Sequence, residues 1–340
     1  MTVDPGPRAA DVLRFWRRAA PKFGLPAPEE TLAAEYYASP RTLAYLVTVD
    51  DLRAVVRWPR GSLLRYDQAA RDAARLFIAA AEAGLAPRVL LWEQGALELD
   101  GQPVVVSEYI AGPPLPPDWF RDNVRQAATL LARLHRDEAL TDLLEHMGRG
   151  DPRGDCLAAA RAAWADVQAR YAALRPRDWS PAVRGVLDEL AGYIPWFGTQ
   201  IQPHLGAFRG HRVGPVHGDL NDSNWLADDD NRVYLVDWEQ ARLDDPALDV
   251  GMVLHWYVPP VLWPLFVREY VTGGSIRLDA DALLIRARIR YPLHIINLCL
   301  WRLEQMAESS GDDEADALAF MGVFLADLRR LRAGTFGVES

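Results

Sequence analysis

The residues best suited to chemistry in this chain gather in two short stretches, 216–226 and 234–239. The first stretch is Val-His-Gly-Asp-Leu-Asn-Asp-Ser-Asn-Trp-Leu, and the second is Tyr-Leu-Val-Asp-Trp-Glu. Carboxylate and amide oxygens suit magnesium, which takes one or two carboxylates from a protein and completes its shell with water and substrate phosphates. The two stretches therefore predict a metal-phosphate site and phosphoryl transfer.

The sequence between these stretches predicts a β-hairpin. Apolar runs at 225–226 and 233–236 flank the cluster 228–231, Asp-Asp-Asp-Asn, which is turn chemistry. If the turn is centred on the last two residues of that cluster, antiparallel pairing places Asn224 opposite Asp237, with side chains about 5 Å apart. Two oxygen ligands would then converge at the open end of the hairpin.

This arrangement gives each polar residue a separate role. Asn224 and Asp237 would bind magnesium, and Glu239 could supply a second carboxylate. Asp219, on the loop that enters the hairpin, would accept the proton of an acceptor hydroxyl. The alternative for any single acidic residue here is a solvated turn residue, but the order and spacing of the set match the catalytic and metal loops of kinases.

Two strings carry a resemblance to a known family. VHGDLNDSNWL and VYLVDWEQARLDDPALDVG resemble the catalytic and metal loops of the aminoglycoside phosphotransferase and choline kinase superfamily, and LARLH at 131–135 resembles the helix before its catalytic loop. The resemblance implies an α+β, bilobal, protein-kinase-like fold, with a small antiparallel-sheet N-lobe and a larger, mainly helical C-lobe. It also implies Mg²⁺, and ATP or GTP as the co-substrate.

The same resemblance assigns residue roles. It implies that Asp219 is the catalytic base, that Asn224 and Asp237 bind magnesium, and that Asp249 is a structural acid that braces the loop. The Asp-Trp-Glu ending at 237–239 looks closer to choline, ethanolamine and thiamine kinase-like members than to protein kinases.

The remaining pattern predicts the elements that position these loops. We expect residues 1–110 to form an N-terminal helix plus a nucleotide-binding lobe, and residues 111–340 to form the helical lobe with the catalytic loops and the acceptor site. Apolar alternation predicts strands at 43–49, 53–58, 87–92 and 103–109. Helical periodicity predicts helices at 11–20, 65–83, 119–137, 155–174, 181–194, 263–271, 280–307 and 313–332, with Pro292 kinking or dividing the seventh.

The donor side departs from the kinase pattern. A kinase needs a cation on its third strand to hold phosphates, yet the only lysine is Lys22. We expect Arg57 to take this role, since a guanidinium binds phosphate through two hydrogen bonds; the alternative is a surface residue at a strand end. Asp72 would orient Arg57, with Glu82 on the same helix as the alternative.

The loop expected to cover the phosphates contains no glycine. It lies near residues 39–42. Without glycine the backbone is less able to approach the phosphates closely, so the Ser39 and Thr42 hydroxyls would have to bind them instead. The nucleotide base is expected against the backbone of the interlobe strand, at Glu108 and Ile110.

Aromatic residues late in the chain are candidates for the acceptor site. Aromatic rings beside carboxylates suit a cationic amine, and the alternative is that they pack the core. The candidates are Asp222, Trp256, Tyr257, Tyr291 and Trp301.

Composition limits the function classes. The chain has 340 residues, 50% of them hydrophobic, and a formal net charge of −10, which argues against nucleic-acid binding and favours cationic acceptors. Cys156 and Cys299 lack metal-type spacing, and no apolar run approaches the length of a membrane span, so a cytoplasmic protein is expected. The leading hypothesis is a small-molecule O-kinase, and the alternative is a nucleotide-binding, pseudokinase-like regulator without turnover.

Overall fold

The chain folds into two compact units. The computed structural model describes residues 8–38, 42–59, 63–112, 115–272, 279–308 and 314–333. Unit 1 combines Met1–Pro116 with two later segments, Asp137–Met147 and Asn221–Ala241. Unit 2 combines Pro117–Arg136, Gly148–Leu220 and Arg242–Ser340.

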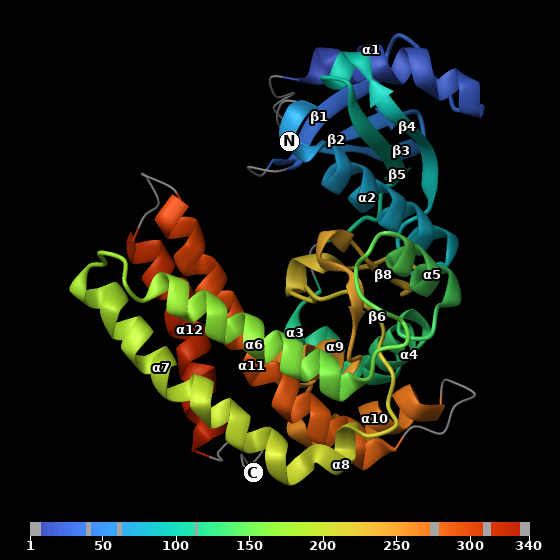
Figure 1. Ribbon diagram of the computed structural model, residues 1–340. Helices are drawn as coiled ribbons and strands as arrows, with labels where there is room; N and C mark the ends of the chain where they lie inside the picture. The colour runs from blue at the N-terminus through green and yellow to red at the C-terminus, as the bar shows by residue number, and fades with distance from the viewer. Residues whose placement is uncertain are drawn as a thin grey trace. The chain divides into compact units, whose positions relative to one another are not determined.

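Unit 1 is built on a five-stranded antiparallel sheet with the strand order β1-β2-β3-β5-β4 (Figure 1). Helix α1 packs near β1, and α2 contacts β5. The strands are β1 (Leu32–Ala38), β2 (Thr42–Val49), β3 (Leu52–Pro59), β4 (Val89–Ala96) and β5 (Gln102–Glu108), and the helices are α1 (Ala9–Ala19), α2 (Leu63–Glu82) and α5 (Glu138–His146).

Alternation along the strands separates the core of this sheet from its pocket side. In β3, Val56 and Trp58 are buried in the unit 1 core with Trp16 of α1 and Tyr45 of β2, whose ring stacks on Trp58 with centroids 5.5 Å apart. The tight connection between β2 and β3 places Asp50 at φ 49°, in the left-handed region that aspartate tolerates better than most residues. The sheet thereby fixes Arg57 on its central strand.

The predicted hairpin is present and belongs to unit 1. Its strands are β7 (Trp225–Ala227) and β8 (Val233–Leu235), with the 3-10 helices η4 (Asp222–Asn224) and η5 (Trp238–Gln240) at its open end. The backbone N–H of Leu235 donates to the carbonyl of Leu85, which follows α2, over 2.7 Å. This hydrogen bond connects the hairpin to the segment that follows α2, the helix that contacts β5 of the sheet.

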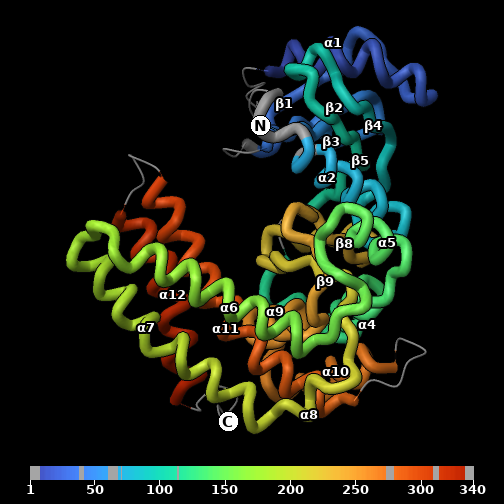
Figure 2. Tube along the Cα trace, viewed as in Figure 1, coloured from blue at the N-terminus to red at the C-terminus, as the bar shows by residue number. Residues whose placement is uncertain are grey.

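Unit 2 is mainly helical. Helices α6, α7, α11 and α12 pack against one another (Figure 2), and α11 also contacts α9 and α8. Asp155 and Ser180 cap the first turns of α6 and α7 by accepting hydrogen bonds from backbone N–H groups. The helices are α3 (Pro117–Asp122), α4 (Val124–Leu134), α6 (Cys156–Leu174), α7 (Pro181–Ile201), α8 (Leu205–Phe208), α9 (Ala247–Trp256), α10 (Trp263–Thr272), α11 (Ala280–Glu308) and α12 (Glu314–Arg332), and one short sheet pairs β6 (Gly214–Val216) with β9 (Arg242–Asp244).

Several elements differ from the sequence-based predictions, and helices α5 and α9 were not predicted at all. The helix predicted at 119–137 is broken at Asn123, whose backbone is not helical and whose side chain donates to the carbonyl of Trp119. Helix α11 runs through Pro292 without interruption. Strand β1 was not predicted, because Leu-Ala-Ala-Glu-Tyr-Tyr-Ala lacks alternation of apolar and polar residues.

The fold class is the expected one: a mixed α+β chain with an antiparallel sheet and many helices. Within the parts of the chain that the structure describes, no helix combines the length and apolar character needed to cross a membrane.

Candidate functional site

Unit 1 contains a cavity of about 500 Å³. This volume falls in the range of small-molecule binding pockets, which is roughly 300–1,000 Å³. The sheet, α2 and the open end of the hairpin supply its walls. Seven of the residues predicted from the sequence line it together: Thr42, Arg57, Glu108, Ile110, Asn224, Asp237 and Glu239.

The hairpin register differs by one residue from the predicted one. Trp225 pairs with Leu235, and the N–H of Val236 donates to the carbonyl of Asn224 over 3.0 Å. Asn224 therefore lies opposite Val236, not opposite Asp237. The reason is a three-residue turn centred on Asp230.

The conformation of Asn231 explains this turn. Its φ of 59° lies in the left-handed region, and the Asp228 N–H donates to the Arg232 carbonyl over 3.0 Å. A type I turn followed by a left-handed residue is a common three-residue hairpin connection. Asparagine tolerates this conformation better than most residues.

Asp237 reaches the cavity although its strand position differs from the predicted one. Its backbone has φ 67° and ψ 63°, a left-handed conformation that is rare for residues other than glycine. The next residue, Trp238, is buried and donates from Nε1 to the carbonyl of Leu235 over 3.0 Å. The tight bend therefore re-aims the Asp237 side chain. Backbone strain of this kind gathers at functional sites.

The oxygen donors at this bend fit magnesium in kind. Asn224 is buried, whereas Asp237 and Glu239 are half-buried. One amide and one or two carboxylates match the protein share of a magnesium shell. Across the described ranges, no group of three or more His, Cys, Asp or Glu side chains is arranged to hold a metal ion.

Arg57 supplies the positive charge of the cavity wall. It pairs with Ala44 of β2 and Val105 of β5, so it occupies the middle of the sheet. Burial raises the pKa of the nearby Tyr36, and the charge of Arg57 works against that rise. Among the residues that the structure describes, no carboxylate forms an ion pair with Arg57 within 4.0 Å.

The predicted partner of Arg57 has a different contact. Asp72 is buried on α2, and its carboxylate accepts a hydrogen bond from the Gln68 side chain over 2.8 Å. Asp72 does not line the cavity, but its neighbours Ala73 and Ala74 do. The role of Asp72 in orienting Arg57 stays a prediction. Ser39 lies outside the described residues.

Two tyrosines that the sequence reasoning missed also line the cavity. The pairing of β1 with β2 shifts between Glu35 and Tyr37, which leaves Tyr36 as an extra residue. A bulge of this kind allows consecutive side chains to point to the same side. Tyr36 and Tyr37 both line the cavity, and Tyr36 meets Tyr109 edge to face, with centroids 5.7 Å apart. The run Tyr-Tyr beside the glycine-free loop was the available signal.

Near the position expected for the nucleotide base, the side chains of Glu108 and Tyr109 are held by contacts with other residues of unit 1. The Glu108 carboxylate accepts from the Arg88 backbone N–H over 2.9 Å, and the Arg53 guanidinium lies over the Tyr109 ring at 4.2 Å from its centroid. The predicted use of backbone groups at Glu108 and Ile110 is compatible with this arrangement.

In unit 2, the loop that carries Asp219 is held by one buried carboxylate. Asp249 accepts hydrogen bonds from the backbone N–H groups of His217, over 2.7 Å, and Gly218, over 3.0 Å. Gly218 has φ 78°, which favours glycine. Asp219 follows directly and is half-buried. This geometry agrees with the bracing role expected for Asp249.

A histidine and a tyrosine support this brace. His135 Nε2 lies 3.1 Å from Asp249 Oδ2, and His135 Nδ1 lies 2.7 Å from the Tyr270 hydroxyl. Burial alone would raise the pKa of Asp249, but the contacts with His135 and with the His217 N–H outweigh it and hold the pKa below its usual value. Asp249 therefore stays ionised and can accept from both backbone groups.

Of the predicted acceptor-side residues, Trp256, Tyr257, Tyr291 and Trp301 lie in unit 2. Tyr291 is fully buried and donates to the Asp327 carboxylate over 2.9 Å, which fits the core-packing alternative. Trp301 is exposed beside Phe320, and Trp256 is half-buried against the Tyr291 ring.

Tyr257 has a supporting contact with the loop that carries Asp219. Its hydroxyl donates to the carbonyl of Leu220, the residue after Asp219, over 3.0 Å. Its ring stacks on Phe120, with centroids 4.3 Å apart. Asp222, in unit 1, is exposed at the start of η4.

Solved structures share this fold over nearly the whole chain. Choline kinase from Cryptosporidium parvum matches with a TM-score of 0.66 and 12% identity, covering 96% of this chain and 95% of the other. A choline/ethanolamine kinase family protein from Mesorhizobium loti matches with a TM-score of 0.59 and 22% identity, covering 95% and 94%. Spectinomycin phosphotransferase, solved with ADP and spectinomycin, matches with a TM-score of 0.54 and 12% identity, covering 86% and 88%.

The family model described as "Phosphotransferase enzyme family" matches residues 37–284. This range contains Arg57, the Asp219 loop, the hairpin and Asp249. Members of this family are small-molecule kinases with a protein-kinase-like fold. The chain therefore belongs to the phosphotransferase enzyme family.

Proposed function

We propose that the protein transfers the γ-phosphate of ATP or GTP to a hydroxyl group of a small molecule, in the manner of choline, ethanolamine and thiamine kinases or of aminoglycoside phosphotransferases. One observation carries the proposal: a single cavity of unit 1 combines the Arg57 guanidinium with the oxygen ligands Asn224 and Asp237. A cation and two oxygen-bearing side chains that could hold a metal ion, all lining one cavity, suit a nucleoside triphosphate.

The residues divide the work. Arg57 would bind the α and β phosphates, and the cavity wall around Glu108 and Ile110 would hold the base. Asn224 and Asp237, with Glu239 nearby, would hold Mg²⁺. When bound, this ion supplies neutralisation of the charge on the phosphates.

Asp219 would act on the acceptor. Its carboxylate would orient the hydroxyl and take its proton while the hydroxyl oxygen forms a bond to the γ-phosphorus. The bond between that phosphorus and the β,γ-bridging oxygen breaks, so ADP or GDP leaves and the product is a phosphate monoester. The Asp249 brace supports this role by fixing the backbone immediately before Asp219.

The test is nucleotide-diphosphate release with Mg²⁺, ATP or GTP, and a panel of amino alcohols, thiamine, aminoglycosides and hydroxy acids. We expect one acceptor class to stimulate release. Asp219→Asn should lower kcat by about 10²–10⁴-fold while the affinity for ADP stays unchanged, because general-base catalysis contributes about that factor. Asp229→Asn, at an exposed position in the hairpin turn outside the proposed site, is the matched control and should leave kcat within about twofold of wild type.

The regulator hypothesis makes a different forecast for the same assay. It expects ADP and ATP to bind, but no acceptor to stimulate release and Asp219→Asn to change nothing. Stimulated turnover that survives in Asp219→Asn would contradict the proposed role of this residue.

A further inference from the structure

Helix α9 and the residue directly after it contact the backbone on both sides of Asp219. Asp249, in the first turn of α9, accepts a hydrogen bond from the Gly218 N–H over 3.0 Å. Tyr257, which follows the last residue of α9, donates from its hydroxyl to the Leu220 carbonyl over 3.0 Å. The chain is therefore held one residue before Asp219 and one residue after it, and every group involved belongs to unit 2.

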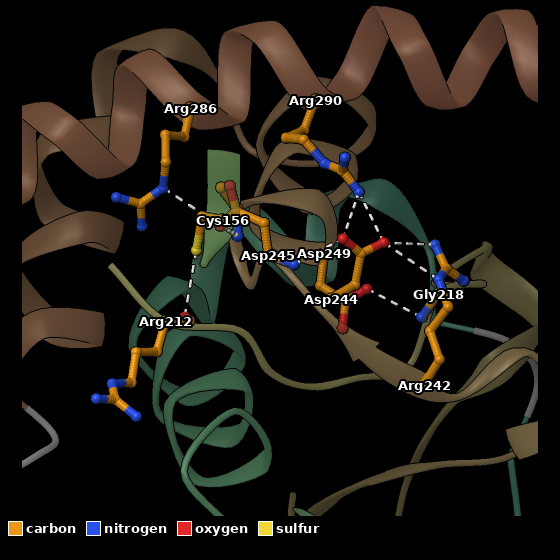
Figure 3. Close-up of polar contacts among 10 residues, drawn as sticks. Cys156, Arg212, Gly218, Arg242, Asp244, Asp245, Asp249, Arg286 and Arg290 are labelled. Carbon is orange, nitrogen blue, oxygen red and sulfur yellow. Dashed lines mark hydrogen bonds and ion pairs between the residues drawn. The ribbon is translucent and has the colours of Figure 1, made fainter. Parts of the chain in front are cut away.

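The start of α9 is anchored by two arginines of α11, which lie one turn apart and each point at one of two consecutive aspartates (Figure 3). Arg290 Nη2 donates to both oxygens of Asp244, over 2.6 and 2.7 Å. Arg286 Nε donates to Asp245 Oδ1 over 3.2 Å, and the same oxygen accepts from the backbone N–H of Ala247, the first residue of α9, over 3.0 Å. All four charged side chains are buried, so solvent ions screen these pairs little.

The end of α9 is anchored by an indole. Trp263 Nε1 lies 3.1 Å from the Leu254 carbonyl and 2.9 Å from the Val258 carbonyl, so one donor contacts the backbone before and after Tyr257. The Tyr257 ring stacks on Phe120 of α3, with centroids 4.3 Å apart and an angle of 15° between the ring planes. The Tyr257 hydroxyl is thus presented from a fixed backbone and a fixed ring.

The acceptor of this hydrogen bond makes the contact relevant to chemistry. Leu220 is fully buried, and a buried carbonyl requires a donor. Leu220 directly follows Asp219, whose carboxylate would need to lie within hydrogen-bond reach of the acceptor hydroxyl. A misplacement of about 1 Å in such a geometry can lower a rate by about 10²-fold. The contact of Asp249 restricts the chain before Asp219, and the contact of Tyr257 restricts it after.

We propose that Tyr257 is a positioning residue of the phosphotransfer reaction: by donating to the Leu220 carbonyl, its hydroxyl holds Asp219 in the orientation that receives the acceptor proton. This role rests on the proposed function, which assigns Asp219 to the acceptor. It differs from the direct contact with the acceptor that the aromatic pattern of the sequence suggested for Tyr257, because here the hydroxyl acts through the backbone of the loop.

Tyr257→Phe removes the hydroxyl and keeps the ring that stacks on Phe120. We expect acceptor-stimulated kcat, counted per ADP-binding site, to fall at least about fivefold, because one lost hydrogen bond has about that effect. The affinity for ADP and the KM for the nucleotide should stay unchanged. Tyr193→Phe is the matched control, since it removes a hydroxyl from a buried tyrosine of α7, and its kcat per site should stay within about twofold of wild type.

A double-mutant cycle with Asp219→Asn separates positioning from other roles. If Tyr257 acts through the Asp219 carboxylate, Tyr257→Phe should change kcat by less than about twofold once that carboxylate is gone. The same fold loss in both backgrounds would mean that Tyr257 contributes independently of Asp219, and the proposal would then be wrong.

Hydrogen exchange of the loop measures the contact without any acceptor. Exchange of peptides covering residues 216–222 is compared with exchange of peptides from α9, in the full chain. Tyr257→Phe should speed exchange of the His217 and Gly218 amides at least about fivefold relative to the α9 amides, because the loop opens more readily once this contact is lost. A general loss of stability would speed both sets of amides equally.

The combination of the two readouts decides the role. A lower kcat with unchanged relative exchange would overturn the proposal, since Tyr257 would then act on the acceptor directly. Faster loop exchange with kcat within about twofold of wild type would also overturn it, because the contact would then be structural only.

The positioning role and the kinase activity fail in different ways. If no acceptor stimulates ADP release but Tyr257→Phe speeds exchange of the loop selectively, the proposed kinase activity fails and the hold of Tyr257 on the Asp219 loop stands. If an acceptor is phosphorylated and Tyr257→Phe matches wild type in both kcat and loop exchange, the kinase activity stands and the positioning role fails.

Discussion

The carboxylate of Asp249 holds the backbone of Gly218, whose N–H donates to Oδ1 over 3.0 Å. The other oxygen accepts from His217 N–H and lies 3.1 Å from His135 Nε2. One side chain thus fixes the backbone conformation at the residue that precedes Asp219. Loss of this side chain should lower both the free energy of unfolding and the rate of turnover.

Asp249→Asn tests this relationship. An asparagine retains only one acceptor oxygen, so at least one buried N–H loses its partner and the amide group opposes another donor. We expect the free energy of unfolding to fall by about 2–4 kcal/mol, measured by urea denaturation, together with a lower kcat. Asp142→Asn changes the same charge at an exposed position on α5 and should stay within about 0.5 kcal/mol of wild type. Equal effects of the two variants would contradict the brace.

Asp237→Asn tests the proposed metal site. Loss of the carboxylate at the left-handed bend should raise the Mg²⁺ concentration needed for half-maximal ADP release by at least about tenfold, because magnesium prefers carboxylate ligands. Glu239→Gln, two residues on, should have a smaller effect if Glu239 is only an accessory group. Chelation should abolish release in wild type, and added Mg²⁺ should restore it. An unchanged Mg²⁺ dependence in Asp237→Asn would remove this residue from the site.

Arg57 can be tested with ligands that differ in their phosphates. Arg57→Ala should weaken ADP binding by about 10–30-fold, since a charge-assisted hydrogen bond to phosphate contributes about 1.5–2 kcal/mol. Arg57→Lys keeps the charge but loses the bidentate geometry, so an intermediate loss is expected. Adenosine has no phosphate and serves as the control, measured by the same calorimetric titration. A similar loss for adenosine would show that the variant damages the cavity and not a phosphate contact.

His294 should make stability depend on pH. Its pKa is about 3 in the folded protein against 6.5 for the free side chain, so the unfolded chain binds the extra proton between these values. This contribution to stability is fully present above pH 6.5 and is lost as pH falls. Between pH 7 and pH 5 the loss is about 2 kcal/mol.

The matched variant for this effect is His294→Gln, which cannot titrate in this range. Urea unfolding at pH 7 and pH 5 should show wild type losing about 2 kcal/mol more than the variant over the same interval. Parallel pH profiles for the two proteins would mean that His294 accepts a proton in the folded state.

Sequence reasoning found the hairpin because its signals are local. Apolar runs on both sides of an Asp-Asn cluster specify two strands and a turn, and the cavity does gather Asn224, Asp237 and Glu239. The register was off by one because the turn length depends on the left-handed conformation of Asn231, which two-residue and three-residue turns both accept. Asp237 faces the cavity through its own unusual backbone, which no pattern of residue types announces.

Sequence patterns could not predict contacts between residues that are far apart in the chain. Tyr291 was proposed for the acceptor from its helical spacing, yet its hydroxyl is bound to Asp327 on another helix. Two arginines, Arg242 and Arg290, likewise enclose Asp244, although Arg290 lies 46 residues further along the chain. Long-range ion pairs of this kind decide what a cavity can recognise, and they become visible only when the helices are placed.

The discontinuous make-up of unit 1 sets an order of events during synthesis. Its sheet is complete at residue 108, but the segment that supplies Asn224 and Asp237 ends at Ala241, after all of Gly148–Leu220 has been made. Because the Leu85 carbonyl receives its hydrogen bond from Leu235 only then, the nascent sheet and α2 must wait for a strand pair from far along the chain. Unit 1 is therefore finished late, and a fragment that stops at Pro116 would carry the sheet without Asn224 and Asp237.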